Sequence, residues 1–173
     1  MKAKLIYVLI VVMLLSVLLS GCNNMLAPLF GLDPEPVPFT FRQERSLMKK
    51  VVIGTYVNGF PVGPTTPILQ LSEAQIDDFY NEMLKVECDK VNELVPPIGY
   101  GDVVFMVTYT DGETEMISFV RHGYVAPDGS YDYTNKIIDK KALSKVFAQF
   151  VSPEELSEAS ERFRHYWYSV ENE

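Results

Sequence analysis

The chain is poor in the residues that most often carry out chemistry in proteins. Its 173 residues include two cysteines, two histidines and one tryptophan. It has no Gly-x-Ser-x-Gly nucleophile elbow, no glycine-rich phosphate-binding loop and no His-Glu-x-x-His zinc helix. We therefore identify no catalytic, cofactor-binding or metal-binding residue from the sequence, and we expect a protein that is not an enzyme.

Positive charge is also scarce. The chain has 15 lysines and arginines against 23 acidic residues, and all the acidic residues follow residue 22, whereas Lys2 and Lys4 precede it. The remainder thus holds 13 basic and 23 acidic residues, a net charge of −10. Such a surface repels phosphate backbones, which excludes nucleic acid as a partner. The acidity also favours solubility and indicates no particular positive partner.

The N-terminus has the three-part layout of a secretory signal. Residues 1–4 are short and basic, residues 5–19 are apolar except for Ser16 and the Tyr7 hydroxyl, and small residues follow. A helix over residues 5–19 would span about 22 Å, which is less than the ~30 Å hydrocarbon core of a bilayer. This length favours a signal peptide over residues 1–21 that is removed. The alternative is an uncleaved signal anchor.

The tetrapeptide Leu19-Ser20-Gly21-Cys22 resembles the bacterial lipobox, in which one bulky apolar residue and two small residues precede a cysteine. The resemblance implies a diacylglycerol on the Cys22 thiol and cleavage before Cys22. Two or more acyl chains hold a protein stably on a bilayer, since each buried methylene contributes about 0.8 kcal/mol. We therefore expect a lipid-anchored protein of the cell membrane that faces outside the cytoplasm.

A proline-rich segment follows the lipid site. Residues 23–41 contain Pro28, Pro34, Pro36 and Pro38, a spacing that blocks helix and favours extended chain. At ~3.1 Å per residue such a tether reaches roughly 60 Å. Its apolar residues either dock on the domain or lie at the lipid interface; they are Leu29, Phe30, Phe39 and Phe41. We divide the chain into the signal peptide 1–21, a lipid-anchored tether 22–45 and a single domain 46–173.

The rest of the chain groups its strand and helix patterns. The expected strands are residues 49–57, 86–91, two strands within 102–121 that flank Asp111-Gly112, and 131–138, and the expected helices begin after Ser72, Asp139 and Ser152. Residues 60–67 hold too many prolines for a central strand. The grouping predicts an α+β fold, with an antiparallel sheet of about four to five strands covered by two to three helices.

Turn and cap signals support this assignment. Asp111-Gly112 fits a type I′ hairpin turn, and Asp128-Gly129 repeats it, giving a three-stranded meander. Ser72 and Gln75 form a capping box at the start of a helix that should run to about Val86. A second long helix should run without a break from Ser152 through Val170.

Over about residues 50–150 the pattern resembles the small domains of uncharacterised lipoproteins from Gram-positive bacteria. The resemblance rests on Leu71-Ser72-Glu73, Gly101-Asp102 and Tyr109-Thr110-Asp111-Gly112. Such domains have no assigned chemistry, so the resemblance implies no active residues.

The histidines and the second cysteine each have a structural interpretation. Glu158, Glu161 and His165 can share one helical face, which admits a metal site, but a solvated polar face explains them as well. His122 lies beside Gly123 and is expected in a turn or on the surface. Cys88 lacks the neighbours of a nucleophile, so we expect a buried structural thiol.

Tyrosines supply the one candidate ligand-binding surface. Tyr131 and Tyr133 share one face of a strand, with Asp132 on the other. An exposed tyrosine stripe can bind glycan or peptide, whereas cross-strand aromatic pairing would only stabilise the sheet. We expect a non-enzymatic binding or accessory domain of the cell envelope, with a protein, peptide or glycan as partner. The alternative is a small envelope hydrolase, or a regulator of one, with an unrecognised site.

Overall fold

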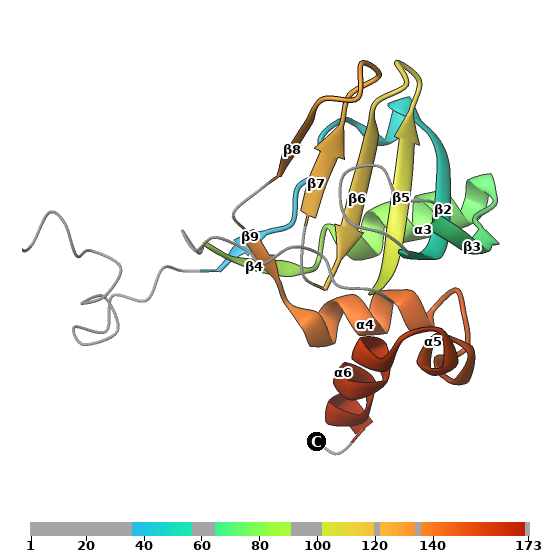
Figure 1. Ribbon diagram of the computed structural model, residues 1–173. Coiled ribbons are helices and arrows are strands. Elements are labelled where there is room, and N and C mark those ends of the chain that lie inside the picture. The colour runs from blue at the N-terminus through green and yellow to red at the C-terminus, as the bar shows by residue number, and fades with distance from the viewer. Residues whose placement is uncertain (1–35, 57–64, 91–101, 120–121, 134–135, 172–173) are drawn as a thin grey trace, which may run out of the picture. The chain divides into compact units, whose positions relative to one another are not determined.

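A computed structural model describes residues 36–56, 65–90, 102–119, 122–133 and 136–171 of the chain (Figure 1). These residues lie within one compact unit, Pro36–Glu173. The elements in chain order are β1 (Val37–Pro38), the 3₁₀ helix η2 (Arg45–Leu47), β2 (Met48–Tyr56), β3 (Thr65–Gln70), α3 (Glu73–Met83), β4 (Glu87–Lys90), β5 (Asp102–Tyr109), β6 (Thr114–Ser118), β7 (His122–Val125), β8 (Tyr131–Tyr133), β9 (Lys136–Ile138), α4 (Lys140–Ala148), α5 (Pro153–Ala159) and α6 (Glu161–Glu171).

The fold is α+β, as the grouping of strands and helices predicted, and its sheet is larger than expected. Six antiparallel strands form the main sheet in the order β3-β2-β5-β6-β7-β8, and a second sheet has the order β1-β4-β9. The prolines around β3 agree with its position, because β3 is an edge strand of the main sheet. β1, β3 and β7 are strands that the sequence pattern did not predict.

One predicted strand is divided between the two sheets. The expected strand 131–138 is β8, which pairs with β7, and β9, which pairs with β4. The expected three-stranded meander has four strands, β5-β6-β7-β8. The additional strand is β7, which begins at His122 and pairs antiparallel with β6.

Both Asp-Gly turns close hairpins, but neither is the predicted type I′ turn. Gly112 and Gly129 have φ of 91° and 83°, and no described non-glycine residue has a positive φ, as type I′ would require of the aspartates. The Gly112 N–H donates to the Tyr109 carbonyl and the Tyr109 N–H to the Glu113 carbonyl, a three-residue loop with a left-handed glycine. The Asp111 carboxylate accepts the Glu113 N–H at 2.9 Å, which stabilises this turn without a left-handed aspartate.

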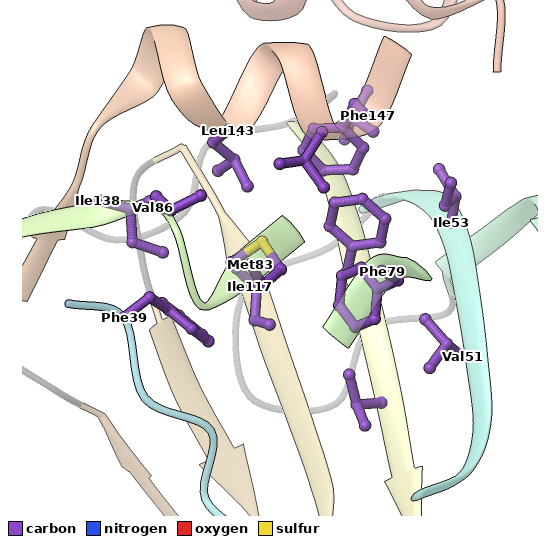
Figure 2. Close-up of a cluster of buried hydrophobic side chains, with 14 of the residues drawn as sticks. Phe39, Val51, Ile53, Phe79, Met83, Val86, Ile117, Ile138, Leu143 and Phe147 are labelled. Carbon is purple, nitrogen blue, oxygen red and sulfur yellow. The ribbon is translucent and has the colours of Figure 1, made fainter. Parts of the chain in front are cut away.

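The main core lies between one face of the large sheet and the helices (Figure 2). α3 begins at the predicted capping box, since the Ser72 side chain accepts the Gln75 N–H and the Gln75 side chain accepts the Ser72 N–H. The helix ends at Met83, three residues before the expected end at Val86. Phe79 of α3 and Phe147 of α4 both contact Phe105 of β5, with ring centroids 4.6 and 4.0 Å apart. Burying each ring contributes about 1.5–3 kcal/mol.

The long C-terminal helix that we predicted is broken at Ser160. This residue is extended, with φ −146° and ψ 117°, and it separates α5 from α6. Its hydroxyl accepts the Phe163 N–H at 3.2 Å and so caps the first turn of α6. The break turns Phe163 into the core, where its side chain is fully buried.

The compact unit includes part of the expected tether. Val37 pairs with Cys88 in β4, the Phe39 N–H donates to the Val86 carbonyl at 2.8 Å, and Phe39 is buried in the main core. Phe41 packs on Phe39 and stacks on Tyr80 of α3. Of the two positions considered for these phenylalanines, docking on the domain is the one observed. The expected boundary between residues 45 and 46 thus falls inside the folded unit.

Candidate functional site

A buried glutamate lies at the centre of the most polar part of the core. Cross-strand pairing places Glu115 opposite Val107 in β5 and opposite Tyr124 in β7. Alternation along β6 puts Glu115, Ile117 and Phe119 on the face that carries the main core. The sequence therefore directs a carboxylate inward, where it needs hydrogen-bond partners.

Three donors meet the Glu115 carboxylate. The Tyr109 hydroxyl donates to Oε2, the His122 ring contacts Oε1 through Nε2, and the backbone N–H of Arg42 lies 3.3 and 3.2 Å from the two oxygens. The side chains of Glu115 and His122 are 0% and 2% exposed. We name Tyr109, Glu115, His122 and Tyr124 the Glu115 cluster. Its hydrogen bonds are charge-assisted, which makes them stronger than those between neutral groups.

The two tyrosines of the cluster are held in their neutral form. Burial and then the nearby Glu115 charge raise the pKa of Tyr109, and the hydrogen bond to Glu115 adds to this. Burial followed by the Glu115 charge also raises the pKa of Tyr124, against the opposing effect of Arg42. Both phenols therefore stay protonated as the pH rises, and Tyr109 remains a donor to the carboxylate.

Residues 36–44, which we name the N-terminal strap, cover this cluster. The Phe39 ring packs on His122, with centroids 4.7 Å apart, and the Arg42 guanidinium lies 4.9 Å from the centre of the Tyr124 ring. The latter is a cation–π contact, which contributes about 0.5–2 kcal/mol. Two side chains of the strap thus cover the cluster: the Phe39 ring lies on His122, and the Arg42 guanidinium lies over Tyr124.

The β5–β6 hairpin holds the strap at its other end. Arg42 Nε lies 3.3 Å from Glu113 Oε1, and the Gln43 amide donates to Asp111 at 2.8 Å and to Glu113 at 2.9 Å. The hairpin thus contacts the strap through three acidic residues, Asp111, Glu113 and Glu115. Because the sequence separation is about 70 residues, no local sequence pattern indicated this contact.

The Glu115 cluster is a group of buried polar side chains that the strap covers. A histidine beside a carboxylate can serve as an acid–base pair in enzymes, but such a pair must reach a substrate. Here both side chains are buried under the strap. In this arrangement the cluster satisfies its own buried polar groups and fixes the strap.

A second buried carboxylate lies at the start of β5. Asp102 is fully buried, with Arg162 Nη1 of α6 at 3.4 Å from Oδ2, and among the described residues its Oδ1 has no hydrogen-bond partner. Burial raises the pKa of Asp102 to about 6, although the Arg162 charge acts in the opposite direction. Asp102 lies opposite Tyr56 of β2 in the sheet register. A raised carboxyl pKa often marks functional sites, but structural ion pairs produce it as well.

The structure describes some of the candidate residues from the sequence and leaves others outside the described part of the chain. Tyr131 lies on the edge strand β8 and is 50% exposed, as a ligand-binding tyrosine must be. The side chain of Tyr133 and the whole of Cys22 lie outside the described residues. Cys88 is buried, as expected. The Tyr131–Tyr133 surface stays a prediction.

Two histidine expectations need correction. His122 is buried in the Glu115 cluster rather than at the surface, because β7 is an interior strand of the sheet. Glu158 lies on α5, whereas Glu161 and His165 lie on α6, so the break at Ser160 separates the three residues that one continuous helix would have aligned. Within the described residues, no group of three His, Cys, Asp or Glu side chains could hold a metal ion.

The fold and the site define an α+β domain whose N-terminal strap closes a buried glutamate–histidine–tyrosine cluster. No family model, curated protein or solved structure matches this chain. In the part of the chain that the structure describes, no helix has both the length and the apolar character needed to cross a membrane.

Proposed function

We propose that the chain is a lipoprotein, anchored to a cell membrane by lipid on Cys22, that exposes a non-enzymatic binding or accessory domain outside the cytoplasm. One observation carries this proposal: Leu19-Ser20-Gly21-Cys22 directly follows a basic and apolar leader. The compact unit begins at Pro36, so residues 23–35 separate the lipid site from the domain. This spacing leaves the domain free to face the aqueous side of the membrane.

The described part of the structure supports a binding role through Tyr131. Its side chain is half exposed on an edge strand, where it can contact a partner. In contrast, the side chains of Glu115 and His122 are buried under the closed strap. The partner that this surface suits is a protein, peptide or glycan of the envelope, since aromatic side chains offer contact area with little loss of entropy.

Substitution of the lipid site tests the anchor. The full chain and its Cys22→Ala variant are expressed in a bacterium that processes lipoproteins, and the membranes are fractionated. We expect the parent in the membrane fraction, with a mass that shows cleavage before Cys22 and an added lipid. The variant should be uncleaved and lack the lipid. Cys88→Ala is the matched control, because it removes the other thiol and should leave lipidation unchanged.

Two results would contradict the anchor: an intact Met1 on the parent, or equal lipid incorporation in the parent and the Cys22→Ala variant. The binding role has its own test. Crosslinking in intact cells, followed by identification of captured molecules, is compared between the parent and Tyr131→Ala. Loss of a specific product in the variant supports a tyrosine surface, and an unchanged set of products contradicts it.

A further inference from the structure

We infer that the N-terminal strap is a latch that opens on its own, without unfolding of the main sheet, and that its opening lengthens the tether between Cys22 and the domain. The effect on the tether rests on the proposed lipid anchor, whereas local opening of the strap does not. Apolar and backbone contacts hold residues 36–44 closed, and burial of a charged side chain opposes their closure.

Apolar burial and backbone pairing hold the strap closed. Phe39 is 1% exposed, and its side chain belongs to the same buried cluster as Val86, Ile117 and Ile138 (Figure 2). Phe41 adds its contacts with Phe79 and Tyr80. The strap has a short backbone pairing: β1 pairs with β4 at Val37 and Pro38. The backbone N–H groups of Phe39 and Arg42 add one contact each, with the Val86 carbonyl and the Glu115 carboxylate. Such a short terminal strand opens at low cost compared with an interior strand.

Closure of the strap carries an electrostatic cost. It removes the Glu115 carboxylate from water entirely, and it buries His122 and the Tyr124 ring with it. Taking an ionised carboxylate out of water is unfavourable, and the three donors to Glu115 offset this cost in part. When the strap opens, water can hydrate the carboxylate, and this offsets part of the lost apolar burial. The two states are thereby brought closer in free energy.

The structure also shows where opening would stop. Arg45 Nη2 lies 2.6 Å from Glu73, and Arg45 Nε lies 2.7 Å from Asp77, so two ion pairs fix η2 to α3. The Thr110 N–H donates to the Leu47 carbonyl at 2.9 Å and ties the same point to the β5–β6 hairpin. Glu44 is the N-cap residue of η2, and its backbone is extended, with φ −68° and ψ 156°. Its side chain makes no capping hydrogen bond to the helix. Opening should therefore pivot at Glu44.

The consequence is a tether of two lengths. With the strap closed, the residues between the lipid site and the domain are 23–35; with the strap open, they are 23–44. At about 3.3 Å per extended residue, the maximum reach rises from roughly 43 to roughly 73 Å. Opening would thus let the anchored domain reach about 30 Å further from the membrane.

Hydrogen exchange of the purified full chain tests the latch, in whichever cell fraction the chain is found. Amides of residues 37–43, which include Phe39 and Arg42, are compared with amides of Val103–Tyr109 in β5 at low denaturant concentrations. We expect the strap amides to exchange at least tenfold faster, with a weaker dependence on denaturant. Equal rates with equal denaturant dependence would overturn the inference, because the strap would then open only with the whole domain.

A pair of variants separates the strap from the core. Phe39→Ala weakens the closed state relative to both the open and the unfolded state, so it should accelerate exchange of the strap and of β5 by about the same factor. The comparison variant is Phe150→Ala, which removes a partly buried ring near Phe105. It should accelerate exchange of β5 at least tenfold more than exchange of the strap, because the core around Phe105 stays folded when the strap opens. If Phe150→Ala changes both by the same factor, the latch is excluded. Failure of lipidation at Cys22 would remove only the role in tether length and would leave these exchange results unaffected.

Discussion

The backbone N–H of Arg42 lies within hydrogen-bond distance of both carboxylate oxygens of Glu115, at 3.3 and 3.2 Å, across 73 residues of sequence. Because the donor is a main-chain group, this contact does not depend on the side chain at position 42. The Arg42 side chain instead contacts Glu113 and the Tyr124 ring. The strap is thus bound at one residue in two ways, by a buried backbone contact and by a more exposed ionic contact.

Removal of the Glu115 carboxylate should be strongly destabilising. In Glu115→Ala the Tyr109 hydroxyl, the His122 ring and the Arg42 N–H lose their common acceptor inside the core. Breaking a buried polar network by removing one partner typically costs about 3–5 kcal/mol. We expect a loss of that size in the free energy of unfolding, measured by urea denaturation at pH 7.

The control for this change is Glu158→Ala, which removes an exposed glutamate from α5. Surface substitutions of this kind usually alter stability by no more than about 0.5 kcal/mol. Similar unfolding midpoints for Glu115→Ala and Glu158→Ala would show that the cluster contributes little to the stability of the domain.

Asp102 should make the domain less stable as the pH rises. Burial raises its pKa from 3.8 to about 6 in the folded chain, so folding favours the neutral carboxyl. The stability that the neutral form provides is complete below about pH 4 and is lost as the pH rises through 6. Asp102→Asn removes this loss. The stability of the variant relative to the parent should therefore increase by about 1–3 kcal/mol between pH 4 and pH 8.

Urea denaturation of parent and variant at several pH values measures this difference. Asp78→Asn is the matched control, because Asp78 is an exposed residue of α3. Its difference from the parent should vary little with pH. A constant difference for Asp102→Asn, or a parent that gains on the variant as the pH rises, would show that the folded state does not disfavour the charged Asp102.

Gly129 offers a test of backbone conformation alone. Its φ is +83°, and a Cβ atom added there would meet nothing within 4 Å. Gly129→Ala should therefore cost about 1–2 kcal/mol of stability through the left-handed conformation alone. Gly129→Asn should cost less, because asparagine tolerates this region better. Thermal denaturation of both variants checks the order, and an alanine variant as stable as the parent would contradict it.

Local sequence signals predicted much of the fold because they act within a few residues. The Ser72–Gln75 capping box and the Asp139 cap are both observed, since each needs only neighbours in sequence. The Asp-Gly pairs correctly marked two hairpins. Their turn type was mispredicted because the aspartate side chain can stabilise the turn by accepting a backbone N–H, with no need for a left-handed aspartate.

The Glu115 cluster could not be predicted in the same way. In the segment Thr114–Phe119, Met116 on one face and Ile117 on the other are both apolar, so alternation did not show which face held the core. The partners of Glu115 come from β5, β7 and the strap, and only the assembled sheet brings them together. The sequence did not show that the strap belongs to the folded domain, because its prolines are typical of a tether. They are equally compatible with an edge strand such as β1.

The junction between α5 and α6 should depend on the Ser160 hydroxyl, which caps α6 by accepting the Phe163 N–H at 3.2 Å. Ser160→Ala should cost about 1 kcal/mol, the usual value for loss of a helix cap. Trp167 reports on α6 directly, because its ring stacks on Phe163 with centroids 5.8 Å apart, so urea unfolding is followed by its fluorescence. Ser157→Ala, in the middle of α5, is the control and should be neutral or slightly stabilising. Equal effects of the two changes would mean that side-chain capping by Ser160 does not hold the junction.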